Sequence, residues 1–591
     1  MKIDYNKIEK NIEEIIENLK GICSQSGLGN TAAEERIITT VFLYKFLNDK
    51  FMWKIKEFAE KEDYKISEIL ESEDKLLLNA FLDTYSGNVA FAYEDTIEFL
   101  IKKRSSEEFY KEFDKALVRI SNNPRNENFN IETSDGSKKP LFEEISKEVD
   151  ETTKNSFVTS IFDSITMDKF DFSIEVSNEQ NHGAVFRKNF DFYSRIFEYL
   201  IKDYNVASGK YAEYFTPQPV SKIISKILVG MSEMKAAAEI YDPSAGSGSL
   251  VLHLANELGS DEGISRSLVY TQDISQKSSR FLRINLLLNG LTESLHNVIQ
   301  GDTILNPSHF EENDPQSGLK SFDYIVSNPP FKLDFSSTRD NIELKWLDAK
   351  NKDGLSRFFA GVPKVPNAKK ESMAIYLLFI QHIIFSLNEK GKAAIVVPSG
   401  FITEKSGISA KIRKYLVDNK ILKGSISMPS NIFANTGTNV SVIFIDKANK
   451  SDEIFLMDAS NLGEKTKEGK NQKTILSHDE EDLIINTFIN RIEKENFSKL
   501  VSYKEVTEKN NSLSVGQYFD VKIEYIDITE EEFNNKITEY NQDIEQLVLK
   551  SQELDKKVVS DLKNLNLLKQ TRKNNCLQHK KDETLHKFHL F

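Results

Sequence analysis

The tetrapeptide Asn328-Pro329-Pro330-Phe331 follows the short apolar run Tyr324-Ile325-Val326, which is typical of a buried β-strand. Proline cannot donate to a sheet ladder, so the two prolines are expected to end that strand. The tetrapeptide is therefore predicted to lie at the carboxyl tip of a strand, where open α/β sheets bind their ligands. Taken alone, the same residues are equally consistent with a strand that ends in an ordinary Pro-Pro turn.

The chemical groups of this tetrapeptide suit the amino group of a nucleobase. The side-chain oxygen of Asn328 and the backbone carbonyl of Pro329 are hydrogen-bond acceptors, whereas an exocyclic amino group carries two N–H donors. Phe331 adds a flat apolar face on which a base can lie. These residues predict a site that holds a base both by its amino group and by its ring.

A strand, a glycine-containing turn and a helix lie upstream of the tetrapeptide. The segment 238–241 is followed by Asp242-Pro243-Ser244-Ala245-Gly246-Ser247-Gly248-Ser249 and then by a helical pattern from Val251. Glycine lets a backbone approach a ligand closely, and a helix N-terminus offers free N–H groups to a carboxylate. A dinucleotide pyrophosphate would also suit such a turn, but Ser249 stands next to the glycines and the third glycine of that fingerprint is missing. The acid precedes the glycines, where it suits a cationic ligand.

Three weaker signals have a consistent order along the chain. The strand pattern 268–273 ends in Asp273, whose carboxylate can accept hydrogen bonds from two ribose hydroxyls. The strand pattern 298–300 is followed by Asp302, and Glu213-Tyr214-Phe215-Thr216-Pro217-Gln218 precedes an amphipathic helical pattern. Each signal is ordinary on its own, but their joint order is hard to obtain by chance.

In this order the motifs resemble those of the class I methyltransferases that methylate adenine N6 in DNA. Asn328–Phe331 resembles their catalytic motif, (D/N/S)PP(Y/F/W), and Asp242–Ser249 resembles their methionine-binding loop, DPxxGSG. The resemblance implies an α/β class I (Rossmann-like) fold and S-adenosyl-L-methionine as the cofactor, and no metal is expected. The catalytic residues that it implies are Asn328, Pro329, Pro330 and Phe331. The cofactor-binding residues that it implies are Glu213, Tyr214, Phe215, Thr216, Pro217, Gln218, Asp242, Ala245, Gly246, Ser247, Gly248, Ser249, Asp273 and Asp302.

The chemistry of adenine indicates how such a site would work. Adenine N6 is a weak nucleophile because its lone pair is delocalised into the ring. Asn328 and Pro329 would accept both N6 hydrogens, so that the lone pair becomes available for in-line methyl transfer and positioning provides most of the catalysis. The base must first be flipped out of the duplex and stacked on Phe331. No nucleophilic cysteine is needed, unlike in cytosine-C5 methylation.

The resemblance extends, over residues 8–567, to the modification (M) subunits of type I restriction–modification systems. It implies an N-terminal helical domain and, as partners, double-stranded DNA, a specificity (S) subunit and a second copy of this chain; it leaves a restriction (R) subunit open. The chain departs from the family pattern at Ala212, where glycine is common, and at Asp273, where glutamate is usual. The alternative is a stand-alone adenine methyltransferase, which would need its own DNA-reading domain. Intact Asn328, Gly246 and Gly248 argue against a non-catalytic binding module.

We expect five segments along the chain. They are an N-terminal helical domain (1–202), a methyltransferase domain (203–450), a mixed connecting region (451–527), a C-terminal helix for subunit docking (528–567) and a loose, basic polar tail (568–591). The C-terminal helix carries an apolar stripe at alternating four- and three-residue steps, typical of a helix–helix seam. The stripe could also pack against its own chain. Its first five members are Phe533, Ile537, Tyr540, Ile544 and Leu547.

The composition indicates a globular protein that relies on a partner to bind DNA. The formal net charge is −14, which disfavours strong DNA binding by this chain alone because phosphate contacts need Lys and Arg. No apolar run is long enough to cross a membrane, and no apolar segment that would mark a signal peptide follows Met1. Cys23 and Cys576 are too few and too far apart for a disulfide framework or a zinc site, so a reducing cytoplasm is expected.

Overall fold

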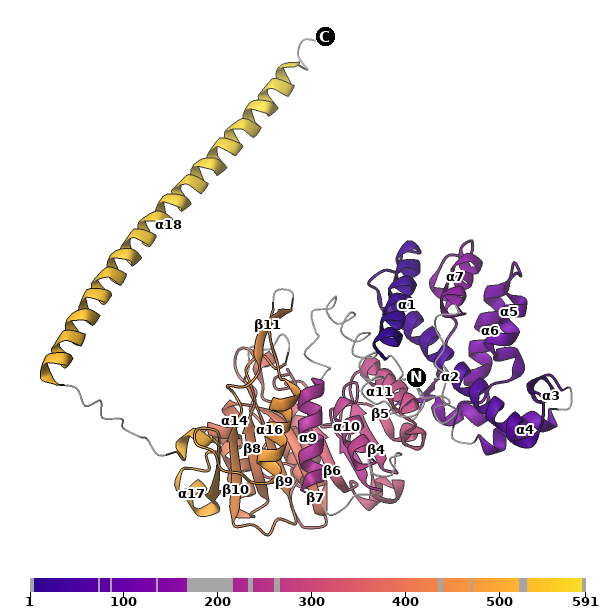
Figure 1. The fold of residues 1–591 in the computed structure, drawn as a ribbon, viewed down its shortest axis with the longest axis horizontal. Coiled ribbons are helices and arrows are strands. Elements are labelled where there is room, and N and C mark those ends of the chain that lie inside the picture. Colours follow the sequence, from indigo (N-terminus) through magenta and orange to yellow (C-terminus); the bar gives the residue numbers. More distant parts are fainter. Residues whose placement is uncertain are drawn as a thin grey trace. The chain divides into compact units, whose positions relative to one another are not determined.

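The computed structural model describes residues 5–72, 75–85, 88–133, 137–166, 216–231, 237–259, 266–433, 439–468, 471–519 and 529–586. By its contacts the chain divides into two units, Met1–Phe519 and Asp520–Phe591 (Figure 1). The first unit contains an N-terminal group of helices and an α/β sheet, and the second contains one long helix.

The described N-terminal region is mainly helical, as the sequence predicts (Figure 1). Its longest helix, α2, begins after Thr31, whose hydroxyl accepts a hydrogen bond from the Glu34 N–H at 3.2 Å. Phe42, Phe46 and Phe51 of α2 are buried in the core of this region. The helices are α1 (Tyr5–Gln25), α2 (Ala32–Glu62), α3 (Ile66–Leu70), α4 (Leu76–Thr84), η1 (Tyr93–Asp95), α5 (Ile97–Lys103), α6 (Phe109–Asn122), η2 (Pro124–Phe129), η3 (Ser146–Glu148) and α7 (Lys154–Thr166).

An eleven-stranded mixed sheet of the class I methyltransferase type forms the centre of the first unit, in the order β13-β10-β8-β9-β7-β6-β3-β4-β5-β1-β2. The central strands β7, β6, β3, β4 and β5 are parallel to one another. A separate hairpin pairs β11 with β12. The strands are β1 (Ile131–Thr133), β2 (Lys138–Lys139), β3 (Glu239–Asp242), β4 (Leu268–Asp273), β5 (Val298–Gln300), β6 (Phe322–Ser327), β7 (Leu387–Pro398), β8 (Leu422–Ser427), β9 (Val440–Asp446), β10 (Glu453–Asp458), β11 (Glu464–Glu468), β12 (Asn471–Ile475) and β13 (Ser498–Ser502).

Helices cover both faces of this sheet, which is why the middle residues of β6 are apolar and buried on both sides. Along β6, Tyr324 and Val326 contribute to one hydrophobic cluster, whereas Ile325 contributes to the cluster on the opposite face. The first cluster contains apolar residues of α9, α10, α11 and α16, and the second contains those of α13, α15 and α17. The helices are α9 (Gln218–Gly230), α10 (Ser249–Leu258), α11 (Gln276–Leu288), η6 (Thr292–Asn297), η7 (Glu311–Asn313), η8 (Pro315–Ser317), α12 (Arg339–Trp346), η9 (Lys370–Ser372), α13 (Tyr376–Ser386), α14 (Gly400–Thr403), α15 (Gly407–Asp418), α16 (His478–Ile489), α17 (Tyr503–Glu508) and η10 (Val515–Gln517).

Two parts of the chain outside residues 203–450 add strands to this sheet. From the C-terminal side, β10 pairs in parallel with β8, and β13 pairs antiparallel with β10. From the N-terminal side, β1 pairs in parallel with β5. The α16 helix also packs on α9, where Lys222 and Glu481 form an ion pair at 2.6 Å. The region expected to connect the methyltransferase domain to the last helix is thus built into the same sheet.

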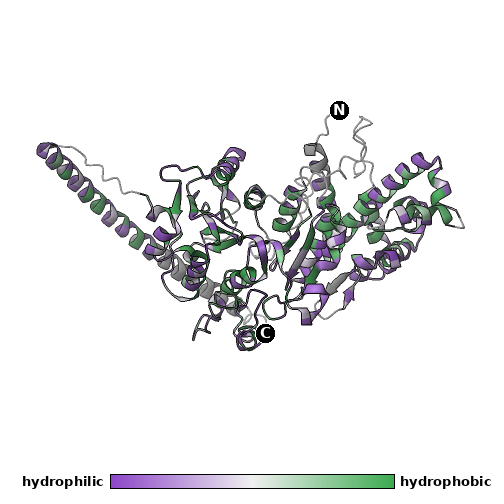
Figure 2. Ribbon diagram, turned by 90° about the horizontal axis from the view of Figure 1, so that it is seen from below, coloured by the Kyte–Doolittle hydropathy of each residue, from purple (hydrophilic) through white to green (hydrophobic). Residues whose placement is uncertain are grey.

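The second unit is the helix α18 (Glu530–His586). It begins with a capping box, in which the Glu532 N–H donates to Thr529 Oγ1 and the Thr529 N–H donates to Glu532 Oε2. The loose tail predicted from residue 568 is wrong, because the helix continues to His586. The chain contains no glycine or proline after residue 528, so nothing in it breaks the helix. In the coloured part of α18, hydrophilic and hydrophobic residues follow one another along the helix (Figure 2).

Candidate active site

The predicted site residues lie at one edge of the sheet. The strands β6, β3, β4 and β5 are neighbours in that order and are parallel, so their carboxyl ends lie side by side. Asp242 and Asp273 end β3 and β4, and Asp302 and Asn328 follow β5 and β6. The chain passes from β3 to β4 and β5 on one side and then returns to β6 on the other. The gap between β3 and β6 is therefore a topological switch point, where open α/β sheets bind ligands.

The loop after β3, residues 242–249, has the backbone geometry of a ligand cradle. Gly246 and Gly248 have positive φ angles of +54° and +87°, which favour glycine. A Cβ atom on Gly248 would lie 2.0 Å from Leu282 Cδ1, so a side chain does not fit there. Gly248 precedes the first residue of α10, and no side chain caps that helix. Its first N–H groups are thus left for an anion.

Asp242 is buried beneath this loop, with 1% of its surface exposed. The backbone N–H of Ser244 donates to Asp242 Oδ1 at 2.9 Å. Burial raises the pKa of the Asp242 carboxyl to about 7, and the nearby Asp273 carboxylate adds to this effect. A cation placed beside Asp242 would favour its ionised form. The position therefore suits a positively charged ligand.

The carboxylate of Asp273 joins β4 to the loop after β3. Its Oδ2 accepts a hydrogen bond from the Gly246 N–H at 2.9 Å, and its Oδ1 accepts one from the Ser275 N–H at 2.7 Å. Burial raises the pKa of this carboxyl as well. Each oxygen retains a second lone pair, so the carboxylate can still accept hydrogen bonds from two hydroxyl groups.

Asp302 has one oxygen tied to its own loop. The backbone N–H groups of Ile304 and Leu305 donate to Asp302 Oδ1 at 2.9 and 3.1 Å. Ile274, directly after Asp273, is 64% exposed, and its carbonyl accepts a hydrogen bond from Gln300 Nε2 at 3.3 Å. Ile274 was not among the residues predicted from the sequence, although an apolar residue directly after a strand-ending acid is a signal that could indicate it.

Asn328 is positioned by a residue far away in the sequence. Its Nδ2 donates to Thr216 Oγ1 at 3.2 Å, which leaves the side-chain oxygen Oδ1 for a ligand. Thr216 is 7% exposed and precedes α9 by two residues. On the sheet side, Ser244 Oγ lies 2.6 Å from Ser327 Oγ, which joins the loop after β3 to the residue before Asn328. Neither Ser327 nor its contact with Ser244 was predicted from the sequence.

Phe331 lies beside other aromatic rings. It is half-buried, and its ring meets that of Tyr376 edge-on at a centroid distance of 6.2 Å. Tyr376 in turn contacts Phe401 at 6.3 Å. Pro329 is buried and Pro330 is exposed. The tetrapeptide thus has a supported backbone and a ring that retains some accessible surface.

The remaining predicted residues are only partly described. Pro217 and Gln218 lie at the start of α9, and Ser249 Oγ is 3.0 Å from Ser221 Oγ of that helix. Ala245 and Ser247 are buried within the loop after β3, and Asn285 Nδ2 donates to the Ser247 carbonyl at 2.9 Å. Glu213, Tyr214 and Phe215 lie outside the described residues.

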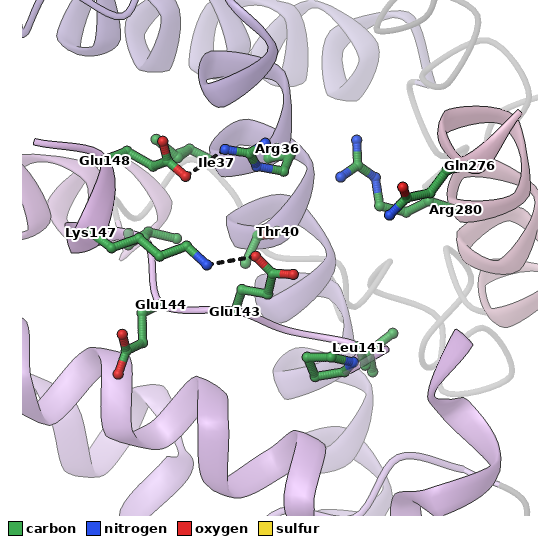
Figure 3. Close-up of a pocket in the computed structure, with 12 residues that line it drawn as sticks. Arg36, Ile37, Thr40, Leu141, Glu143, Glu144, Lys147, Glu148, Gln276 and Arg280 are labelled. Carbon is green, nitrogen blue, oxygen red and sulfur yellow. Dashed lines mark hydrogen bonds and ion pairs between the residues drawn. The ribbon is translucent and has the colours of Figure 1, made fainter. Parts of the chain in front are cut away.

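A pocket between the N-terminal helices and α11 is a different place in the fold (Figure 3). Four of its charged side chains form two ion pairs: Arg36 with Glu148, and Lys147 with Glu143 at 2.7 Å. Arg280 of α11 forms an ion pair with Glu35 at 2.9 Å. None of the predicted site residues lines this pocket. It forms a charge-paired junction rather than the predicted site.

Comparisons with known proteins agree with this geometry. The model of the family N-6 DNA Methylase matches residues 188–526, which is more than half of the chain. The chain is 27% identical over 582 residues to the type I restriction enzyme MpnII methylase subunit of Mycoplasma pneumoniae, covering 94% of this chain and 96% of that protein. It is 25% identical to the MjaVIII methylase subunit of Methanocaldococcus jannaschii, covering 91% and 92%.

A solved structure shares the fold. The type I restriction-modification system methyltransferase subunit from Streptococcus thermophilus has a TM-score of 0.62 and 20% identity, covering 87% of this chain and all of that one. None of the described helices combines the length and apolarity needed to cross a membrane. The chain belongs to the N-6 DNA methylase family, as an S-adenosyl-L-methionine-dependent, adenine-specific methylase subunit of the type I restriction–modification class.

Proposed function

We propose that this chain binds a flipped adenine of double-stranded DNA at the tip of β6 and S-adenosyl-L-methionine along the tips of β3, β4 and β5. The observation that carries this proposal is the 2.6 Å contact between Ser244 and Ser327. It joins the loop that would hold the methionine part of the cofactor to the residue before Asn328. Because β3 and β6 are adjacent, the two reactants would meet at this switch point.

The groups at the three other tips match the parts of the cofactor. S-adenosyl-L-methionine supplies a methyl group on a positively charged sulfur. Asp242 would face its cationic end, and the uncapped start of α10 would bind its carboxylate. Asp273 would accept hydrogen bonds from the ribose hydroxyls through its remaining lone pairs. Ile274 would cover the adenine ring, and Asp302 would contact the edge of that ring.

On the target side, Asn328 Oδ1 and the Pro329 carbonyl would accept the two N6 hydrogens of the flipped base. Thr216 would fix the orientation of the Asn328 amide by accepting from its nitrogen. Phe331 would stack on the base and exclude water. Since the methyl transfer needs only alignment and a free lone pair on N6, these residues act by position and polarity rather than by covalent attack.

The test is Asn328→Ala in the full chain, purified together with its specificity subunit. We expect single-turnover methyl transfer to DNA to fall by about a hundredfold or more. The Kd for S-adenosyl-L-methionine, measured by calorimetry, should stay within a few-fold. Asn490→Ala, at the exposed end of α16, is the matched control and should keep both properties. Near-normal turnover by the Asn328 variant would contradict the assignment.

The proposed partner is a specificity subunit, bound through α18, with two copies of this chain in the complex. The stripe residues Phe533, Ile537, Tyr540, Ile544 and Leu547 are all exposed. Their spacing fits a helical partner, which would cover them. The net charge of −14 supports a division of labour in which the partner chooses the DNA site.

The stand-alone alternative is less well supported. It needs a DNA-reading domain, and the described residues between 451 and 519 add strands to the central sheet instead of forming one.

Within the same proposal, residues 1–202 are a helical domain, residues 203–450 carry the chemistry and residues 528–567 dock the partner. A reducing cytoplasm is the proposed location; Cys23 is a free, buried thiol.

A further inference from the structure

Arg357 is a buried arginine in the segment after the target-base motif, and it donates hydrogen bonds to the loop after β5 on the cofactor side. Arg357 is 0% exposed and lies in the segment between β6 and α13. Its Nη2 donates to the Thr303 carbonyl at 2.8 Å, and its Nη1 donates to the Ile304 carbonyl at 2.9 Å. Both acceptors directly follow Asp302.

A tryptophan from the same segment donates a hydrogen bond to the next residue of this loop. Trp346 Nε1 donates to the Leu305 carbonyl at 2.7 Å. The Arg357 guanidinium lies 4.6 Å from the centre of the Trp346 ring and 4.9 Å from that of Phe358. Three consecutive carbonyls, of residues 303, 304 and 305, are therefore held by one segment that leaves the sheet after Asn328-Pro329-Pro330-Phe331.

Residues 303–305 also form hydrogen bonds with two parts of the proposed cofactor site. The backbone N–H groups of Ile304 and Leu305 hold Asp302 Oδ1, as described above. Thr303 Oγ1 donates to the Pro243 carbonyl, in the loop after β3, at 2.7 Å. A shift of residues 303–305 would thus move the Asp302 carboxylate and loosen the methionine loop together.

A neutral histidine completes the surroundings of Arg357. Arg357 Nε donates to His382 Nδ1 at 3.2 Å, and His382 Nε2 lies 3.2 Å from Tyr241 Oη. Burial and the Arg357 charge lower the pKa of His382 well below its ordinary value. With Nδ1 as an acceptor, Nε2 carries the proton and donates to Tyr241, the residue before Asp242.

We infer that Arg357 is a positioning residue for cofactor binding. It fixes the loop 302–305 from the segment that follows the target-base motif, so that the cofactor side and the target side of the site keep their relative positions. This inference rests on the proposed placement of the cofactor beside Asp302. It adds a residue that touches neither reactant. It also predicts that cofactor affinity depends on a segment belonging to the target side.

A second buried arginine provides a matched control. Arg413 is also 0% exposed, donates to the carbonyls of Phe401, Glu404 and Asn511, and lies 5.8 Å from the Phe401 ring. Its acceptors lie in α14 and the loops near α15 and α17, not in the loops after β3, β4 or β5. Lysine at either position keeps one charge but cannot make the same fork of hydrogen bonds.

The experiment compares Arg357→Lys with Arg413→Lys in the full-length chain, by calorimetric titration with S-adenosyl-L-methionine and by thermal unfolding without it. Both variants should unfold at a lower temperature. Arg357→Lys should raise the Kd about tenfold, as expected for one or two lost hydrogen bonds, whereas Arg413→Lys should change it less than about twofold. Equal Kd values for both variants would overturn the inference.

Two further variants keep the result interpretable. Asp273→Ala should raise the Kd on the proposed function alone; if it does and Arg357→Lys does not, only the inference fails. If neither variant changes the Kd, the cofactor placement itself is wrong. Should Arg357→Lys not fold, Trp346→Phe removes the Leu305 hydrogen bond while keeping a ring, and should raise the Kd about threefold. An unchanged Kd for that variant would also overturn the inference.

Discussion

Replacing Thr216 with Val should slow methyl transfer without much loss of cofactor affinity. Valine has nearly the shape of threonine but no hydroxyl, so the change removes the acceptor that holds Asn328 Nδ2 at 3.2 Å. Losing this hydrogen bond, and leaving a half-buried N–H without its partner, costs about 1 to 2 kcal/mol. If this whole cost is added to the activation free energy of methyl transfer, the rate falls about 5- to 30-fold.

The assay is single-turnover transfer of a labelled methyl group to DNA by the complex with its specificity subunit, at saturating S-adenosyl-L-methionine. Thr216→Ser keeps the hydroxyl and should restore most of the rate. Thr216 was also predicted from the sequence to bind the cofactor, and the two roles give different results. A variant with a weaker Kd for the cofactor but a normal saturated rate would refute the positioning of Asn328.

Two other predictions concern the cofactor acid and the last helix. Because burial raises the pKa of Asp242 to about 7 and a cationic ligand favours the ionised carboxylate, the affinity for S-adenosyl-L-methionine should rise about tenfold from pH 6 to pH 8, and Asp242→Asn should flatten that dependence in calorimetric titrations. The same raised pKa means that the cofactor-free protein loses stability as the pH rises from about 4 to about 7, which chemical denaturation at several pH values would reveal. Removing residues from Ile528 onward should leave cofactor binding intact and abolish co-purification with the specificity subunit; a truncated chain that still methylated a defined sequence would disprove the docking role.

The strand tips could be predicted from the sequence because each signal is local. In β3, β4, β5 and β6 an apolar run meets an acid, a glycine turn or a proline pair within a few residues, and the structure confirms all four strands. The strands β1 and β13 lacked such signals. Ile131–Thr133 has three residues, and Ser498–Ser502 alternates weakly, so their pairing depends on neighbours far away in the chain.

The contacts that orient the site residues could not be read from the sequence. Thr216 and Asn328 are 112 residues apart, and Tyr241 and His382 are 141 residues apart. Such pairs depend on the strand order, which no single motif specifies. A buried arginine such as Arg357 even contradicts the usual expectation, since charged residues are rarely buried without a partner. Its partners are backbone carbonyls, and a sequence does not show where those carbonyls will point.

The acidic net charge and the exposed last helix both fit a chain that works together with a partner. A helix of 57 residues has a length of about 86 Å, and its stripe from Phe533 to Leu547 remains exposed in this chain. Covering five such side chains would contribute about 7 to 15 kcal/mol before the costs of association. That gain is of the same order as the costs of association, about 4 to 15 kcal/mol, so the stripe would form one part of a larger interface. A chain with a net charge of −14 can then leave DNA affinity and site choice to that partner, and keep for itself a site specialised for one base and one cofactor.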